Sequence, residues 1–431
     1  MLTEMGRNAR AASRVIANAA SETKNQALRT LASMIDQSRA DIHAANNADV
    51  ELARASGMSD ALVDRLLLTD KRLDDLSRDL RSLAKFPDPV GERFDETVLP
   101  NGLKLYKRRV PLGVVGVIYE SRPNVTIDVS GLAIKTSNAA ILRGGKETVR
   151  SNRALTELVQ MALKKSGLPA QSVQSIDNPD RALVLDLLKL HEYVDIVIPR
   201  GGESLHRFCR ENSRIPVITG GIGICHIFID ESADLERALP VIHNAKTQRP
   251  SVCNALDTLL VHRSIAAQAL PRVVENLSPA GVTFRAHESA VPYLMLEPDP
   301  MKFGKGLSAG LPEPVRPAEP GDFDTEWMAL VLGLKVVDSL DEAIAHTNAH
   351  SMGHSDSILT ENRENADRWI EEVDSAAVYV NASTRFTDGG QFGLGAEVAI
   401  STQRLHARGP MGLRELTTYK WVAEGSYSIR E

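Results

Sequence analysis

The stretch from Ala245 to His262, AKTQRPSVCNALDTLLVH, places a cysteine where it could do chemistry. Cys253 follows a short polar approach and precedes an apolar run typical of a buried strand. At such a strand end a thiol can face a cleft, and a thiolate is a strong nucleophile. Free cysteines are also commonly buried and inert, so position alone leaves both interpretations open.

A thiolate that attacks a carbonyl group needs a hydrogen-bond donor for the oxyanion that forms. Asn124, in YESRPNVT, follows the strand-like GVVGVIY and could supply one. An asparagine at this position could equally be a turn residue. We expect the other two cysteines, Cys209 in LHRFCREN and Cys225 in GIGICHIFID, to be packing residues.

Two glycine-rich turns indicate where a phosphate could bind. ILRGGKE contains Gly144, Gly145 and Lys146, and VIPRGGESLHRF places Gly201 and Gly202 before a helix. Glycines let the backbone approach a phosphate closely, and a helix N-terminus supplies N–H donors. Either pair could also be an ordinary strand-to-helix turn, because the sequence contains neither GxGxxG nor a P-loop motif.

Three histidines are spaced by four residues, as metal ligands on a helix could be: His346, His350 and His354. The residues from Ser351 to Gly353 should interrupt a helix there, and no zincin-type glutamate lies between the histidines. We therefore interpret the histidines as loop residues and expect no metal.

The elements that must position these residues alternate between strands and helices. Strand-like GVVGVIY, NAAIL and YVDIVI are separated by helical segments, which predicts βαβ units on parallel sheets and ligands at the carboxyl ends of the strands. Alternating residues around Asn101 and Gly102 predict a β-hairpin.

The composition is that of a globular protein with more than one domain. The chain has 431 residues, 43% hydrophobic content and a net charge of −6, which argues against binding to nucleic acid. Three cysteines form no disulfide framework, and no apolar run is long enough for a membrane span. We expect a cytoplasmic protein.

Several longer motifs together resemble the γ-glutamyl phosphate reductases, a family of the aldehyde dehydrogenase superfamily. They are PLGVVGVIYESRPNVT, NAAILRGGKE, QRPSVCNALDTLLVH, NAHSMGHSDSI and the C-terminal NASTRFTDGGQFGLGAEVAISTQRLHARGPMGLRELTTYKW. The resemblance implies an aldehyde dehydrogenase-like α/β fold, with a Rossmann-type cofactor domain, a second α/β catalytic domain and a small β oligomerisation element.

The resemblance also assigns catalytic roles. Cys253 matches the nucleophile, and Asn124 matches the asparagine that holds the oxyanion together with the Cys253 backbone N–H. The implied substrate is L-glutamyl 5-phosphate. Its negative charges call for cations, for which Arg122 and Arg385 are candidates, although Arg122 could equally be a structural arginine.

For the cofactor, Lys146 matches the lysine that binds the adenosine ribose or its 2′-phosphate. Gly201 and Gly202 fall where the pyrophosphate lies, and Glu326 resembles the glutamate that bonds the nicotinamide ribose. Arg143 beside Lys146 would suit a 2′-phosphate, which favours NADPH over NADH.

One departure from the wider superfamily bears on the reaction. Where oxidising members carry a glutamate in an ELGGK-like turn, this sequence reads TGGIGICH, without a carboxylate. Without that base, water should attack a thioester slowly, which suits exchange with phosphate. The alternatives are a hydrolytic aldehyde dehydrogenase and a non-catalytic scaffold for glutamate 5-kinase, which is also a candidate for transient contact.

We expect three structural parts. Residues 1–93 and 111–230 should form the dinucleotide-binding domain, and residues 231–404 the catalytic domain with Cys253. Residues 94–110 and 405–431 should form an oligomerisation element, in which each tail covers the sheet edge of a partner in a homodimer. The alternative is that hairpin and tail pair within one chain.

Overall fold

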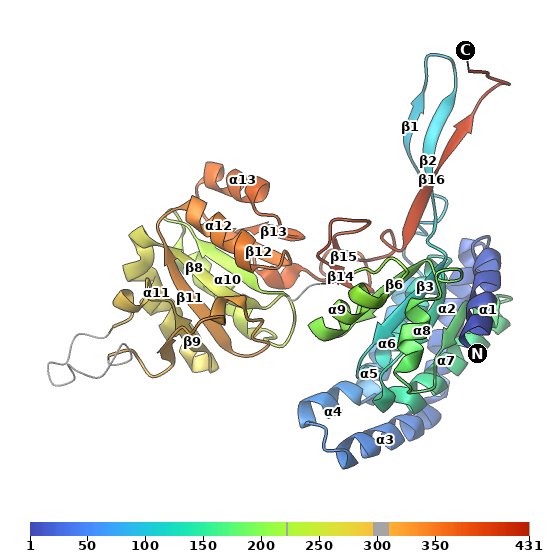
Figure 1. The fold of residues 1–431 in the computed structure, drawn as a ribbon, viewed down its shortest axis with the longest axis horizontal. Coiled ribbons are helices and arrows are strands. Elements are labelled where there is room, and N and C mark those ends of the chain that lie inside the picture. The colour runs from blue at the N-terminus through green and yellow to red at the C-terminus, as the bar shows by residue number, and fades with distance from the viewer. Residues whose placement is uncertain (221–222, 296–309, 431) are drawn as a thin grey trace. The chain divides into compact units, whose positions relative to one another are not determined.

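The computed structural model describes residues 1–220, 223–295 and 310–430 (Figure 1). The chain forms two compact units, each with its own parallel sheet. Unit 1 comprises Met1–Gly220, Gly393–Ile400 and Pro410–Glu431, and unit 2 comprises Gly221–Phe392 and Ser401–Gly409. The predicted α/β class with parallel sheets is therefore confirmed.

Unit 1 contains a four-stranded parallel sheet in the order β5-β4-β3-β6. Its strands are β3 (Val114–Tyr119), β4 (Ala139–Arg143), β5 (Val173–Ser175) and β6 (Ile196–Arg200). The chain runs from β3 outward to β5 and then returns to place β6 on the other side of β3. The carboxyl ends of β3 and β6 therefore flank a topological switch point, where ligands bind in such sheets.

Helices surround this sheet because their apolar residues recur at helical spacing. They are α1 (Leu2–Ile16), α2 (Ser21–Gln37), α3 (Arg39–Ala55), α4 (Asp60–Leu66), α5 (Asp70–Leu83), α6 (Asn124–Lys135), α7 (Val149–Lys165), α8 (Ala182–Leu188) and α9 (Glu203–Asn212). One fully buried cluster joins α1, α8 and α9 to β3, β4 and β6. The crossover helices α6 and α7 contact β4 and β5, and α2 and α5 pack on α6.

The predicted hairpin is confirmed, and the tail pairs with it in the same chain. Strand β1 (Arg93–Val98) pairs antiparallel with β2 (Lys104–Pro111), and Gly102 turns between them with a φ of 83°. Strand β16 (Thr417–Glu424) pairs with β2 of the same chain. The tail thus pairs with the hairpin within one chain, as in the stated alternative, and completes a three-stranded sheet. The contact of the tail with a partner subunit stays a prediction.

Unit 2 contains a seven-stranded parallel sheet in the order β10-β9-β11-β8-β7-β12-β13. The strands are β7 (Cys225–Ile229), β8 (Leu256–His262), β9 (Thr283–Ala286), β10 (Val315–Pro317), β11 (Val331–Val337), β12 (Ser355–Leu359) and β13 (Ala377–Val380). The helices are α10 (Leu235–Thr247), α11 (Arg263–Leu277), α12 (Leu340–His350) and α13 (Arg363–Glu372).

Both faces of this sheet are covered, which explains the continuous apolar runs in its strands. Leu259 and Val261 of β8 belong to the buried cluster with α10 and α11, whereas Leu260 belongs to the cluster with α12 and α13. Successive residues of a strand point to opposite faces, so the two clusters lie on opposite sides of the sheet.

The two units differ in places from the expected division. Residues up to 230 were expected in the first domain, but β7 pairs with β8 and β12 and so belongs to unit 2. The hairpin and β16 group with unit 1, whereas residues 405–409 group with unit 2. The roles assigned to the three parts stay predictions. No helix within the described ranges is long and apolar enough to cross a membrane.

Candidate active site

Cys253 lies in a turn just before β8, half-buried, as its position in the sequence predicts. The start of β8 is held from α10 by a fully buried lysine. Lys246 donates through Nζ to the carbonyl of Leu256 at 2.7 Å and pairs with the Asp257 carboxylate at 3.4 Å. A buried charge must be paired in this way, so the segment that carries Cys253, the predicted nucleophile, is firmly anchored.

Arg385, a predicted substrate ligand, is brought to the same region by the residue that follows Cys253. Asn254 donates through Nδ2 to the carbonyl of Thr387 at 2.9 Å, and its own carbonyl accepts from Thr384 Oγ1 at 2.7 Å. Arg385 lies between these contacts and donates through Nε to Gln248 at 2.9 Å. Burial lowers the pKa of Arg385, while the nearby thiol of Cys253 acts to raise it. A cation therefore lies within electrostatic reach of the thiol.

The backbone of Cys253 packs directly against residues just before and at the start of β7. A Cβ atom added at Gly223 would lie 1.7 Å from the Cys253 carbonyl oxygen, so only glycine fits there. The thiol of Cys225 donates to the same oxygen at 3.3 Å. Burial raises the pKa of Cys225 well above its usual value, which keeps this thiol protonated and able to donate.

Glu326 is joined to Cys253 through the same glycine. Its Oε1 accepts from the backbone N–H of Gly223 at 3.2 Å, and the side chain is half-buried. Burial raises the pKa of Glu326, opposed by its bond to Gly223. Gly223 therefore contacts both residues: its N–H bonds to Glu326, the predicted ribose ligand, and its backbone packs on Cys253, the predicted nucleophile. Gly221 and Ile222 of the TGGIGICH turn lie outside the described residues.

In unit 1, Asn124 is the first residue of α6 and lies just beyond the carboxyl end of β3. Its Nδ2 donates to Asp128 Oδ2, one helical turn along, at 3.0 Å. The second N–H on the same nitrogen is not part of this bond, which leaves the amide able to donate to an oxyanion. Arg122 lies in the turn before α6 and is half-buried.

The Gly201–Gly202 turn follows β6 and opens α9, as predicted. A Cβ at Gly202 would meet nothing within 4 Å, and its backbone N–H donates to the Glu120 carboxylate at 3.4 Å. The N–H of Gly202 is therefore bonded to a carboxylate, and the binding of a pyrophosphate at this turn stays a prediction.

Lys146 and Arg143 differ in how they could meet a cofactor. Lys146 begins a short 3-10 helix after β4, and its side chain is exposed. Arg143 is buried and donates to the carbonyls of Gly144 and Pro179. Burial lowers its pKa. The Arg143 guanidinium holds the loop, because it faces inward, and its contact with a 2′-phosphate stays a prediction.

The expectation that the three histidines are loop residues is wrong for two of them. His346 and His350 lie on α12, which ends at His350, so they are not loop residues. Their rings are 4.3 Å apart, and His350 pairs with Asp324 at 2.6 Å. The helix continues further than expected because the interruption begins only at Ser351. Among the described residues, no group of three or more His, Cys, Asp or Glu side chains could hold a metal ion.

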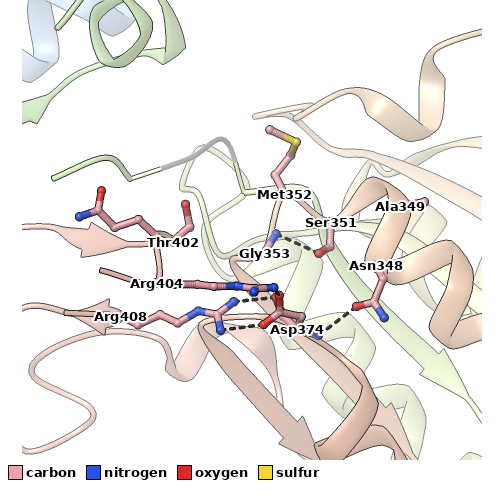
Figure 2. Close-up of a pocket in the computed structure, with 10 residues that line it drawn as sticks. Asn348, Ala349, Ser351, Met352, Gly353, Asp374, Thr402, Arg404 and Arg408 are labelled. Atoms are coloured by element: carbon pink, nitrogen blue, oxygen red, sulfur yellow. Dashed lines mark hydrogen bonds and ion pairs between the residues drawn. The ribbon is translucent and has the colours of Figure 1, made fainter. Parts of the chain in front are cut away.

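A cavity of about 540 Å³ lies beside the family-like segment NAHSMGHSDSI (Figure 2). Its walls include Asn348 and Gly353 from this segment and two arginines, Arg404 and Arg408, that both bond to Asp374. Because the Asp374 carboxylate already pairs with both guanidinium groups, these charges are balanced within the cavity wall.

The predicted site residues thus form two groups, one in each unit. Cys253, Arg385 and Glu326 lie near the amino ends of β7 and β8 in unit 2, not at the carboxyl ends where ligands were expected. The others lie at or just beyond the carboxyl ends of β3, β4 and β6 in unit 1: Asn124, Arg122, Lys146, Arg143, Gly201 and Gly202. The sequence analysis did not identify Gly223, Cys225 and Asp128 as neighbours of the predicted site residues. For Asp128, its spacing of four residues from Asn124 in a helical segment could have indicated the contact.

Comparison with known proteins defines the class first. The aldehyde dehydrogenase family model matches residues 2–288 and 323–422. A solved acetylating aldehyde dehydrogenase from Geobacillus thermoglucosidasius shares the fold, with a TM-score of 0.68 at 18% identity over 99% of this chain and 97% of that one.

Closer relatives narrow the class. Gamma-glutamyl phosphate reductase from Roseiflexus castenholzii is 57% identical over 100% of this chain and 99% of that protein. The enzyme of the same name from Pectobacterium carotovorum is 55% identical over 100% of both chains. The crystal structure of gamma-glutamyl phosphate reductase from Thermotoga maritima superposes with a TM-score of 0.93 at 49% identity, over 99% of each chain. The chain belongs to the gamma-glutamyl phosphate reductases of the aldehyde dehydrogenase family.

Proposed function

We propose that this chain reduces L-glutamyl 5-phosphate to L-glutamate 5-semialdehyde and phosphate with NADPH, the second step of proline biosynthesis from glutamate. The observation that carries the proposal is the anchored Cys253, with Arg385 within electrostatic reach and the Gly223 backbone against its carbonyl. A cytoplasmic location, where thiols stay reduced, is part of the proposal.

The reaction begins at sulfur. Positive charge near a thiol favours the thiolate, and Arg385 supplies it together with Arg249, which also acts on Arg385. The thiolate of Cys253 attacks the γ-carbonyl carbon, the bond from that carbon to the phosphate oxygen breaks, and inorganic phosphate leaves. Asn124 Nδ2–H and the Cys253 backbone N–H stabilise the oxyanion during this step.

The cofactor fits the residues of unit 1. The Gly201–Gly202 turn would hold the pyrophosphate, Lys146 the 2′-phosphate, and Glu326 of unit 2 the nicotinamide ribose. When bound, NADPH supplies the hydride that reduces the Cys253 thioester. The resulting thiohemiacetal collapses, which releases the aldehyde and returns Cys253 to the thiolate.

The substrate is itself an unstable acyl phosphate. Arg122 and Arg385 are proposed to bind its acidic groups, since charge-assisted bonds from arginine suit carboxylates and phosphates. Because an acyl phosphate is readily lost to water, we also propose a transient contact with glutamate 5-kinase, which would supply it.

The decisive experiment runs the reaction in the oxidative direction. With glutamate 5-semialdehyde and NADP⁺ but no phosphate, we expect a single burst of NADPH equal to the enzyme concentration, because the thioester forms and persists. Added phosphate should convert the burst into continuous turnover. Continuous turnover without phosphate would identify a hydrolytic aldehyde dehydrogenase instead.

Replacement of Lys146 with Ala should raise the KM for NADPH far more than that for NADH. The exposed ammonium is proposed to contact only the 2′-phosphate, and losing a charge-assisted bond costs about 1.5–3 kcal/mol, or roughly tenfold to a hundredfold. Steady-state kinetics with both cofactors measure the difference. Equal losses would place Lys146 away from the 2′-phosphate, and Lys164→Ala, on the exposed side of α7, provides a matched control.

We further propose a homodimer built by extension of a sheet between subunits. The three-stranded sheet ends at β16, whose Tyr419 and Trp421 side chains are 47% and 60% exposed. An open strand edge with exposed aromatic rings suits pairing with a second copy.

Deletion of the chain from Thr417 onward removes β16 and should convert the dimer to a monomer. Deletion from Gly425 onward leaves β16 intact and should preserve the dimer. Light scattering of the full-length and truncated proteins at micromolar concentration measures the mass. A monomeric full-length protein would contradict the proposal.

A further inference from the structure

The amide of Asn124 is oriented by a residue that the reaction scheme has not used. Nδ2 of Asn124 donates to Oδ2 of Asp128 at 3.0 Å, from the first turn of α6 to the next. An ionised carboxylate only accepts hydrogen bonds, whereas an amide presents a donor nitrogen on one side and an acceptor oxygen on the other. The carboxylate therefore specifies which side of the Asn124 amide faces it.

We propose that Asp128 is a positioning residue of the oxyanion site, whose carboxylate fixes the Asn124 amide so that its second N–H meets the substrate oxygen. The inference rests on the oxyanion role proposed for Asn124. An amide free to rotate would present its own oxygen to the developing negative charge in part of the population. That orientation would repel the transition state instead of stabilising it.

The charged groups around Asp128 come from two other elements of unit 1. Burial raises the pKa of Asp128 to about 6, opposed by the bond from Asn124 and by Arg200 at the end of β6. Asp79 of α5 acts in the raising direction. Protonation gives Asp128 an O–H donor that can pair with the oxygen of Asn124, so the specified orientation is lost. The active form is the ionised one, and kcat should fall as the pH falls through about 6.

The first test is Asp128→Asn, which keeps the shape but can donate as well as accept. We expect kcat at neutral pH to fall roughly tenfold, because a misoriented catalytic group is costly. The KM for NADPH and the melting temperature should stay unchanged, and the acid limb that belongs to Asp128 should disappear from the pH profile. Asp186→Asn, an exposed carboxylate on α8, is the matched control and should retain wild-type kinetics.

A double-mutant cycle separates this inference from the proposed function. Asn124→Ala should lower kcat by about a hundredfold or more, as for other oxyanion donors. Adding Asp128→Asn to that variant should then cost nothing further, because Asp128 acts only through Asn124. The same loss in both backgrounds would overturn the inference while leaving the oxyanion role intact. An Asn124→Ala variant with wild-type kcat would overturn both.

The wild-type protein offers a measurement that needs no variant to fold. If kcat shows no decline between about pH 7.5 and pH 5, Asp128 does not control the amide by its charge. NADPH affinity measured by fluorescence over the same range reports whether any decline arises from cofactor binding instead, which would also contradict the inference.

Discussion

Replacement of Cys253 with Ala is expected to abolish reduction of L-glutamyl 5-phosphate, with kcat lower by about four orders of magnitude or more. The sulfur atom forms the covalent bond in the proposed scheme, and the neighbouring Cys225 thiol is kept protonated by its burial. NADPH affinity, measured by fluorescence titration, should be nearly unchanged, because the proposed cofactor ligands are Lys146, Glu326 and the Gly201–Gly202 turn.

The matched control is Cys209→Ala, which removes a thiol buried in the core of unit 1. This variant should lose stability, since it leaves a small cavity, but should retain its turnover per folded molecule. Mass spectrometry of the wild-type enzyme after the phosphate-free burst should find the acyl group on Cys253. Appreciable turnover by Cys253→Ala, or an acyl group elsewhere, would exclude the thioester route.

The local pattern of the sequence predicts most elements that carry the site. The apolar runs GVVGVIY and LDTLLVH became buried strands β3 and β8, and the turn that contains Asn101 and Gly102 joined the predicted hairpin strands. Such periodic and turn signals are local, so they can be interpreted without knowledge of the tertiary contacts. Arg143 shows the limit, because no local signal indicates that its guanidinium turns inward to two carbonyls.

The pairing of distant segments could not be predicted either, because no local signal specifies it. No local signal in the sequence indicates that β16 pairs with β2 of the same chain. The contact between Gly223 and the Cys253 carbonyl likewise joins residues far apart in the sequence. Glycine is common in turns, so its type alone did not distinguish an essential position from an ordinary one.

Replacement of Gly223 with Ala should have the second-largest effect, because it would act on the nucleophile without touching its sulfur. A Cβ atom there would lie 1.7 Å from the carbonyl oxygen of Cys253 and 2.7 Å from its carbonyl carbon. Both neighbours are backbone atoms, so the clash can be relieved only by moving backbone, either the turn that carries Cys253 or the segment that carries Gly223. A displacement of about 1 Å at a reacting group can cost roughly a hundredfold in rate.

We therefore expect Gly223→Ala to lower kcat by at least about a hundredfold, with the KM for NADPH raised as well, since Glu326 is bonded to the same residue. The rate of Cys253 alkylation by iodoacetamide reports on the nucleophile separately and should change. Circular dichroism and the melting temperature show whether the variant remains folded. In contrast, Cys225→Ala removes only the thiol that donates to the same carbonyl, and its smaller volume lets the turn stay in place. A folded Gly223→Ala enzyme with wild-type kcat would show that the turn can move without loss of catalysis, and that the Cys253 backbone does not depend on this contact.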